Sequence, residues 1–223
     1  MQRLFDIIFS GIALVIFLFP MTIIALILKF SGEGEIFFFQ YRVGKSNKKI
    51  KLIKFATMLK NSENIGTGTI TVYNDPRILP FGHFLRKTKL NELPQLLNVF
   101  FGDMSVIGPR PQTQRCFDAF PESSRHAILK VRPGLSGIGS IVFRSEEDMM
   151  NSYENPDYLY DNVIMPYKGK LEEWYVKNNT LAIYFKLIFI TLLVIFAPKL
   201  NTIWSLFPSL PKPPEKLKNW IKV

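Results

Sequence analysis

Residues 6–30, DIIFSGIALVIFLFPMTIIALILKF, form an almost unbroken apolar segment, and its placement governs how the rest of the chain is read. A helix of about 25 residues is long enough to cross a bilayer whose hydrocarbon core is ~30 Å thick. Two interpretations stay open. The segment is a straight transmembrane anchor, or it is a re-entrant helix broken at Pro20, because proline has no N–H to donate to the carbonyl of Ile16.

The charges that flank this segment favour the re-entrant interpretation. Arg3 precedes it, Lys29 lies at its end, and Arg42 and Lys45 follow it. Basic residues on both flanks favour the cytoplasmic side for both ends. We therefore predict a re-entrant helix within residues 1–31, at the bacterial inner (cytoplasmic) membrane, with the remaining chain on the cytoplasmic face.

The composition agrees with a membrane-associated protein that handles anions. Of the 223 residues, 20 are Phe, and 28 Lys and Arg against 18 Asp and Glu give a net charge of +10. Such a charge favours an anionic partner, either membrane lipids or a phosphorylated substrate. No nucleic-acid-binding motif accompanies the charge, so we expect no nucleic acid partner. The single Cys116 cannot form an intramolecular disulfide, which is consistent with a reducing compartment.

The rest of the chain alternates between short strands and helices. Ile36–Gln40 and Lys48–Phe55 have strand patterns, and the second alternates basic and apolar residues. Helical patterns follow at residues 83–98, 118–130, 146–160 and 171–197. The predicted fold is α/β or α+β, a monotopic membrane protein with a re-entrant hydrophobic helix, a small sheet and interfacial amphipathic helices. The predicted division is 1–31 for the membrane helix, 32–198 for the catalytic domain and 199–223 for a basic, Pro-rich tail.

Four polar stretches carry the residues suited to phosphate chemistry. Arg110 lies between two prolines, which fix the local backbone and suit a phosphate clamp. Glycines beside Arg132 allow backbone amides to approach an anion closely. Taken singly, each stretch also has an ordinary interpretation as a turn or a solvated helix face. The four stretches are NDPR (74–77), LRKTKLNELPQ (85–95), GDMSVIGPRP (102–111) and VRPGLSGIGS (131–140).

In this order, the four stretches resemble the bacterial sugar transferase family, the small monotopic phosphoglycosyl transferases. The resemblance extends from the first apolar segment to about Phe196 and is most specific between Asp75 and Pro111. It implies transfer of a sugar 1-phosphate from a UDP-sugar to polyprenyl (undecaprenyl) phosphate, with release of UMP. This reaction initiates the assembly of a bacterial surface polysaccharide or glycoconjugate. The resemblance also implies Mg²⁺ and a membrane helix broken at a proline, here Pro20.

The family's catalytic pair is an Asp-Glu dipeptide in a DELPQ motif. In the family the Asp attacks the phosphorus to form a covalent phosphosugar intermediate, and the Glu helps to bind the metal. The matching residues here are Asn91 and Glu92. Phosphoryl transfer relies mainly on positioning and charge neutralisation, which calls for a metal and several arginines. The predicted substrate-binding residues are Asp75, Arg77, Arg86, Arg110 and Arg132.

Asn91 is the main departure from the family pattern, because an amide is a poor nucleophile. Three hypotheses stay open: Glu92 is the nucleophile, polyprenyl phosphate attacks directly, or the chain is a non-catalytic membrane adaptor that retains the transferase fold. Ala56 and Tyr184 are further departures, standing where the family usually has Arg and often has Asp. The sugar, the glycan pathway and the oligomeric state are not predicted.

Overall fold

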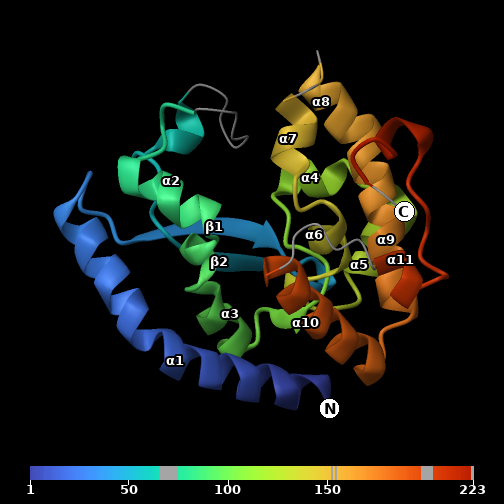
Figure 1. Cartoon of the computed structure of the whole chain (residues 1–223), viewed down its shortest axis with the longest axis horizontal. Helices are drawn as coiled ribbons and strands as arrows, with labels where there is room; N and C mark the ends of the chain where they lie inside the picture. The colour runs from blue at the N-terminus through green and yellow to red at the C-terminus, as the bar shows by residue number, and fades with distance from the viewer. Residues whose placement is uncertain (66–74, 152, 154, 197–202, 222–223) are drawn as a thin grey trace.

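The computed structural model describes residues 1–65, 75–151, 153, 155–196 and 203–221, and its architecture is mostly helical with two small sheets (Figure 1). The predicted mixture of helices with a small sheet is thus confirmed. In chain order the elements are α1 (Gln2–Phe30), β1 (Phe37–Val43), η1 (Lys45–Asn47), β2 (Lys49–Phe55), η2 (Ser62–Asn64), α2 (Pro80–Lys87), η3 (Leu90–Glu92), α3 (Gln95–Phe101), β3 (Ser105–Ile107), α4 (Gln114–Asp118), α5 (Glu122–Ile128), β4 (Gly134–Ser136), α6 (Ile138–Val142), α7 (Glu146–Asn151), α8 (Pro156–Leu159), the π-helix η4 (Tyr160–Ile164), α9 (Met165–Lys177), α10 (Leu181–Phe196), α11 (Ile203–Leu206) and η5 (Glu215–Leu217).

The larger sheet pairs β1 with β2 in antiparallel register, from Phe37 opposite Phe55 to Val43 opposite Lys49. Both predicted strands are therefore present. Alternation along β2 buries Ile50 and Leu52 and leaves Lys49 and Lys51 exposed, as expected for a strand with one solvent-exposed face. The smaller sheet is parallel and pairs β3 with β4. It joins the Pro-Arg-Pro segment to the Gly-rich segment.

The apolar N-terminal segment is one helix of 29 residues, α1, with Pro20 inside it. In the described part of the chain it is the one helix that is long and apolar enough to cross a membrane. Figure 1 shows that α1 bends, so that its two halves run in different directions along the edge of the molecule. A proline inside a helix removes one hydrogen bond and is a common cause of such a kink. The helix continues through Pro20 and does not end there.

The first half of α1 is attached to the globular part by polar contacts and by the packing of Phe5 and Phe9 against Phe185 of α10. Asp6 is almost completely buried, and its Oδ1 accepts hydrogen bonds from Ser105 Oγ, the Val106 N–H and the Tyr184 hydroxyl, each at 2.9 Å. The Arg3 guanidinium donates to the carbonyl of Phe100 at 2.6 Å. Tyr184, one of the departures from the family pattern, thus serves as a donor to a buried carboxylate.

The second half of α1 is attached through apolar contacts. Ile24 and Leu28 are buried in a cluster with Phe55 of β2 and Leu85 of α2. Both halves of the helix therefore rest on the same globular part. The opposite face of α1 remains exposed and apolar, with large side chains that include Ile12, Val15, Ile16, Leu18, Phe19, Ile23 and Leu26.

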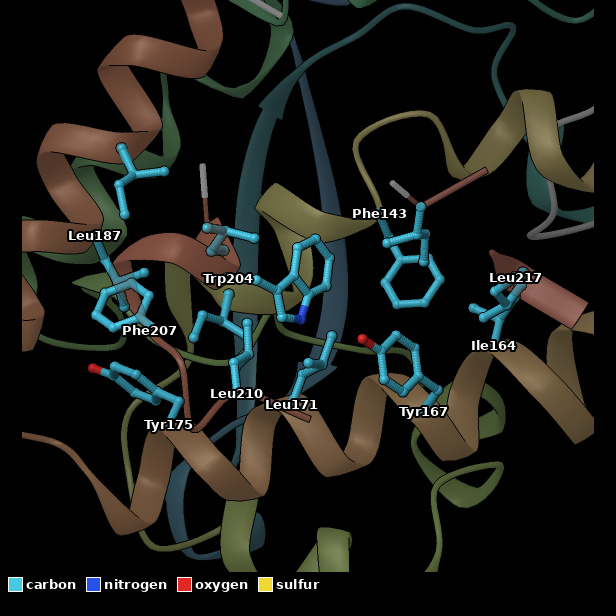
Figure 2. Close-up of a cluster of buried hydrophobic side chains, with 14 of the residues drawn as sticks. Phe143, Ile164, Tyr167, Leu171, Tyr175, Leu187, Trp204, Phe207, Leu210 and Leu217 are labelled. Carbon is cyan, nitrogen blue, oxygen red and sulfur yellow. The ribbon is translucent and has the colours of Figure 1, made fainter. Parts of the chain in front are cut away.

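The largest core cluster surrounds α9 and α10, and residues 203–221 are part of it. Figure 2 shows Trp204 and Leu210 among the side chains of α9, near Leu171 and Tyr167. The Tyr167 hydroxyl donates to the carbonyl of Pro211 at 2.8 Å. The predicted helix at 171–197 is divided in two, since α9 ends at Lys177 and α10 begins at Leu181.

Candidate active site

Glu92 lies at the end of the short helix η3, between two cationic side chains. Its Oε1 is 2.5 Å from Arg110 Nη2 and 3.4 Å from Lys54 Nζ, and its Oε2 is 3.3 Å from Arg110 Nη1. The Glu92 side chain keeps 16% of its surface exposed, so the cluster is largely desolvated but not closed. The structure therefore brings together two residues predicted from separate motifs, Glu92 and Arg110.

The electrostatics of this cluster favour an ionised Glu92. Burial opposes ionisation, but the charges of Arg110 and Lys54 outweigh it and hold the pKa of Glu92 far below its usual range. Burial lowers the pKa of Lys54 to about 8, against the opposing effect of Glu92. The site thus holds one carboxylate whose charge is compensated from two sides.

Lys54 is a site residue that the sequence prediction did not include. It was grouped with the basic residues of the second strand. Its spacing carried a signal, because Lys54 is two residues from Leu52 and four from Ile50, both of which are buried. Side chains at i, i+2 and i+4 of a strand lie on one face. A lysine on the buried face of a strand requires a partner, and Glu92 is that partner.

Asn91 is buried beside Glu92, with 7% of its surface exposed. In the described part of the chain, its Oδ1 has no hydrogen-bond partner, and neither does Nε2 of Gln95 on the following turn. Buried polar atoms are normally paired, so two unpaired ones in one motif point to a ligand at this position. An amide oxygen can accept a donor or bind a hard cation, although it is a poor nucleophile.

The Pro-Arg-Pro and Gly-rich segments are in direct backbone contact. The Gly134 N–H donates to the Pro109 carbonyl at 2.8 Å. A Cβ atom at Gly137 would lie 2.1 Å from the carbonyl oxygen of Gly108, so glycine is required there by space. Arg132 precedes this contact and is half-buried.

The other predicted binding residues, Asp75, Arg77 and Arg86, have contacts of their own. Asp75 and Arg77 form a buried pair with contacts of 2.8 and 2.5 Å, and Arg77 Nη1 also donates to the carbonyls of Ser62 and Ile65. Arg86 Nη1 lies 3.8 Å from Met58 Sδ. The substrate-binding roles of these residues stay predictions, while the Asp75–Arg77 pair has a clear structural role in holding residues 62–65.

The site has the donor set that Mg²⁺ uses when a substrate supplies phosphates. Among the described residues there is no group of three or more His, Cys, Asp or Glu side chains that could hold a metal by themselves. Mg²⁺ is usually bound by one or two carboxylates together with substrate phosphates and waters. The Glu92 carboxylate and the unpaired Asn91 Oδ1 fit that arrangement.

The sequence is similar to several known transferases and exopolysaccharide production proteins. An exopolysaccharide production protein, ExoY of Rhizobium meliloti, is 33% identical over 65% of this chain and 70% of its own length. A UDP-glucose:undecaprenyl-phosphate glucose-1-phosphate transferase of Escherichia coli is 37% identical over 69% of this chain. A UDP-galactose-lipid carrier transferase of Erwinia amylovora is 30% identical over 86% of this chain. The matched regions make up only 34% of the Escherichia protein and 40% of the Erwinia protein. The sequence matches the family described as bacterial sugar transferase over residues 1–198, and the chain belongs to that family.

Proposed function

We propose that this protein transfers a sugar 1-phosphate from a UDP-sugar to polyprenyl phosphate, and so initiates assembly of a bacterial surface polysaccharide or glycoconjugate. The observation that carries the proposal is Glu92 held between Arg110 and Lys54, directly after Asn91, whose buried Oδ1 has no partner among the described residues. This cluster combines cations that can neutralise a diphosphate with oxygen atoms that can bind a metal. The names of the relatives support the same substrate classes.

The chemistry proposed is direct transfer, because Asn91 replaces the family's usual nucleophile. An oxygen of polyprenyl phosphate attacks the phosphorus that carries the sugar. The new O–P bond forms as the P–O bond to the UMP phosphate breaks, and the bonding electrons leave with UMP. Arg110 binds the charge on the transferred phosphoryl group, and Lys54 keeps Glu92 ionised. Mg²⁺, bound by Glu92 and Asn91 Oδ1, would neutralise the diphosphate.

The proposed placement is monotopic, on the cytoplasmic face of the inner membrane. A straight span would separate the two ends of α1 by a hydrocarbon core of ~30 Å. The polar contacts of Asp6 and the apolar contacts of Leu28 instead attach both halves to one globular part, which supports a re-entrant helix bent near Pro20. The exposed apolar side chains of α10, which include Phe185, Phe189, Leu192 and Ile195, support an interfacial position for that helix.

Single cysteines in a Cys116→Ser background test this placement. Leu4→Cys and Lys45→Cys lie on either side of the apolar segment, and both positions are exposed. Both should resist a membrane-impermeant thiol reagent added to intact cells and react after the cells are opened. Labelling of one cysteine alone in intact cells would show a straight span.

The transfer reaction is tested by incubating the purified protein with Mg²⁺, polyprenyl phosphate and a panel of UDP-sugars, and measuring UMP. Direct transfer predicts a sequential initial-rate pattern and no trappable adduct. A phosphosugar adduct trapped on Glu92 would contradict direct transfer and show that Glu92 is the nucleophile. Ping-pong kinetics in Asn91→Asp would show that the wild-type site lacks only the nucleophile needed to form a covalent intermediate.

A second function, that of a non-catalytic membrane adaptor, is favoured by one observation, the loss of the nucleophilic Asp at position 91. It predicts that no UDP-sugar yields UMP and that Asn91→Asp alone does not restore turnover. Binding of a UDP-sugar without turnover would distinguish an adaptor that keeps its ligand site from one that has lost it.

A further inference from the structure

One face of the β1–β2 sheet is exposed and aromatic. Phe37, Phe39 and Tyr41 alternate along β1, and their exposed fractions are 39%, 48% and 67%. Side chains at alternate positions of a strand lie on one face. The solvated face of an antiparallel sheet normally carries polar side chains. Three large aromatic side chains in a row on such a face therefore indicate a surface that binds a partner.

Strand β2 adds positive charge to the same face. Tyr41 lies directly opposite Lys51, Val43 lies opposite Lys49, and both lysines are exposed. The Lys51 Nζ is 4.1 Å from the centre of the Phe39 ring, which is a cation–π contact. Every charged residue from 37 to 55 is Lys or Arg. The surface thus combines aromatic rings with uncompensated cations, and its complement is anionic.

The aromatic row begins beside the second half of α1. The rings of Phe37 and Phe55 are stacked with their centres 5.7 Å apart, and Phe55 is buried in one cluster with Ile24 and Leu28 of α1. Figure 1 shows β1 leading from that side of the molecule towards its centre. The large side chains on the outer face of the helix are exposed as far as Phe30, at its end. The exposed aromatic face therefore continues the apolar surface of the membrane helix.

We propose that this face of the sheet, formed by Phe37, Phe39, Tyr41, Lys49 and Lys51, is a docking surface for the anionic headgroup layer of the membrane. Aromatic side chains gather at the membrane–water interface, and lysines near an anionic leaflet are attracted to it. A second copy of the chain fits the face less well, because two such faces would bring like charges together. The inference rests on the proposed placement of α1 in the membrane and adds a contact that neither α1 nor α10 supplies.

The docked sheet would orient the Glu92 cluster relative to the lipid. Lys54 lies on the other face of β2 from Lys49 and Lys51, since side chains alternate along a strand, and its Nζ is 3.4 Å from Glu92 Oε1. One strand thus carries headgroup contacts on one face and a residue of the candidate active site on the other. The phosphate of polyprenyl phosphate also lies at headgroup level.

The test uses an environment-sensitive fluorophore on single cysteines in a Cys116→Ser background. The full-length protein is placed in nanodiscs of phosphatidylcholine and phosphatidylglycerol that contain a spin-labelled phospholipid as quencher. Phe39→Cys and Tyr41→Cys, two independent positions on the sheet face, should both be quenched. Phe19→Cys, on the exposed side of α1, reports the placement of the helix. Tyr158→Cys is the matched control and should not be quenched, since it is an exposed aromatic residue on α8, which Figure 1 shows far from α1.

The labelled positions separate the possible outcomes. Quenching at Phe19→Cys but at neither sheet position would overturn the docking surface and leave the membrane placement intact. Absence of quenching at Phe19→Cys would count against the placement itself. A blue-shifted emission at Phe39→Cys without lipid quenching would show that a protein covers the face, either a second copy or another partner, and would also overturn the proposal.

The anionic character of the partner is tested by charge. Lys49→Gln combined with Lys51→Gln should lose most of the quenching at Tyr41→Cys in nanodiscs with phosphatidylglycerol, and added salt should have the same effect. Lys170→Gln combined with Lys177→Gln is the matched control, because it removes the same charge from exposed lysines of α9. Equal quenching with and without phosphatidylglycerol, unchanged by the loss of Lys49 and Lys51, would overturn the assignment to anionic headgroups.

Discussion

Two arginine–carboxylate pairs of similar geometry have different roles in this molecule. Glu92–Arg110 and Asp75–Arg77 each have a contact of 2.5 Å. In the second pair the side chain of Asp75 is 1% exposed and that of Arg77 is 4% exposed, and Arg77 also donates hydrogen bonds to the carbonyls of Ser62 and Ile65. In the first pair, the Arg110 side chain is 35% exposed. The comparison teaches that an ion pair can serve a ligand only where part of its surface remains open, and that a closed pair holds the chain together.

The largest expected effect is on activity, at the open pair. Glu92→Gln should lower kcat by roughly 10²–10³-fold, the usual effect of removing one electrostatic group from a transition state. The measurement is UMP release at saturating substrates. The same variant leaves Lys54 without its partner, so thermal unfolding should show a loss of stability that is smaller than the loss in Asp75→Asn. A loss as large as that of Asp75→Asn would show that the open pair is as structural as the closed one.

The closed pair should show the opposite pattern. Asp75→Asn leaves the buried Arg77 without its counter-charge, and breaking such a pair lowers the free energy of unfolding by about 3–5 kcal/mol. Denaturant unfolding measures this loss. The fraction that remains folded at low temperature should keep a kcat near that of the wild type. Normal stability together with lost UDP-sugar binding would instead place Asp75 in the substrate site.

A third carboxylate, Glu172, extends the comparison through its pH dependence. Burial raises its pKa to about 7, above the ordinary value of 4.5, despite the opposing charge of Lys168. Its contribution to stability is therefore complete below pH 4.5 and is lost as the pH rises through 7. Over that range the loss should be about 2–3 kcal/mol, since one pKa unit corresponds to 1.36 kcal/mol. Chemical denaturation across pH 5–8 should show a shallower decline in Glu172→Gln than in the wild type and in Glu173→Gln.

A smaller effect is expected from exchanging the cation of the open pair. Arg110→Lys keeps the charge but loses the ability to make two parallel (bidentate) hydrogen bonds. We expect the KM for the UDP-sugar to rise about tenfold, equivalent to about 1.4 kcal/mol. Steady-state kinetics at a fixed concentration of polyprenyl phosphate measures it. An unchanged KM would remove Arg110 from the diphosphate site.

The smallest expected change in stability is at Arg132, which is only half-buried. Arg132→Gln should change the free energy of unfolding by less than about 0.5 kcal/mol. If Arg132 contacts the diphosphate as predicted, the same variant should still weaken UDP-sugar binding, measured by calorimetry. Loss of stability without loss of binding would show that Arg132, like Arg77, has a structural role.

The sequence predicted the residues of both pairs as site residues and could not predict how the two pairs differ. Glu92 and Arg110 belong to motifs whose order is specific, so their meeting was expected. Asp75 and Arg77 form an equally polar turn, and nothing in the local sequence shows that residues 62–65 will enclose it. Glu172 lies in KLEEWYVK, where a charged helix face looks solvated, and only tertiary packing buries it against Gly139. Burial of charged groups depends on contacts between distant segments, and local patterns do not contain that information.

The attachment of Asp6 has a consequence for how the protein is made. The Asp6 carboxylate is bonded to Ser105, 99 residues later, and to Tyr184, 178 residues later. Translation at about 5–20 residues per second separates Asp6 from Tyr184 by roughly 10–35 s. In the proposed monotopic arrangement, the apolar helix would reach the membrane well before its last partner exists, with a carboxylate that only water or lipid headgroups can solvate. Docking of the helix onto the finished domain would then be a late step of biogenesis, with Asp6 near the membrane surface until it occurs.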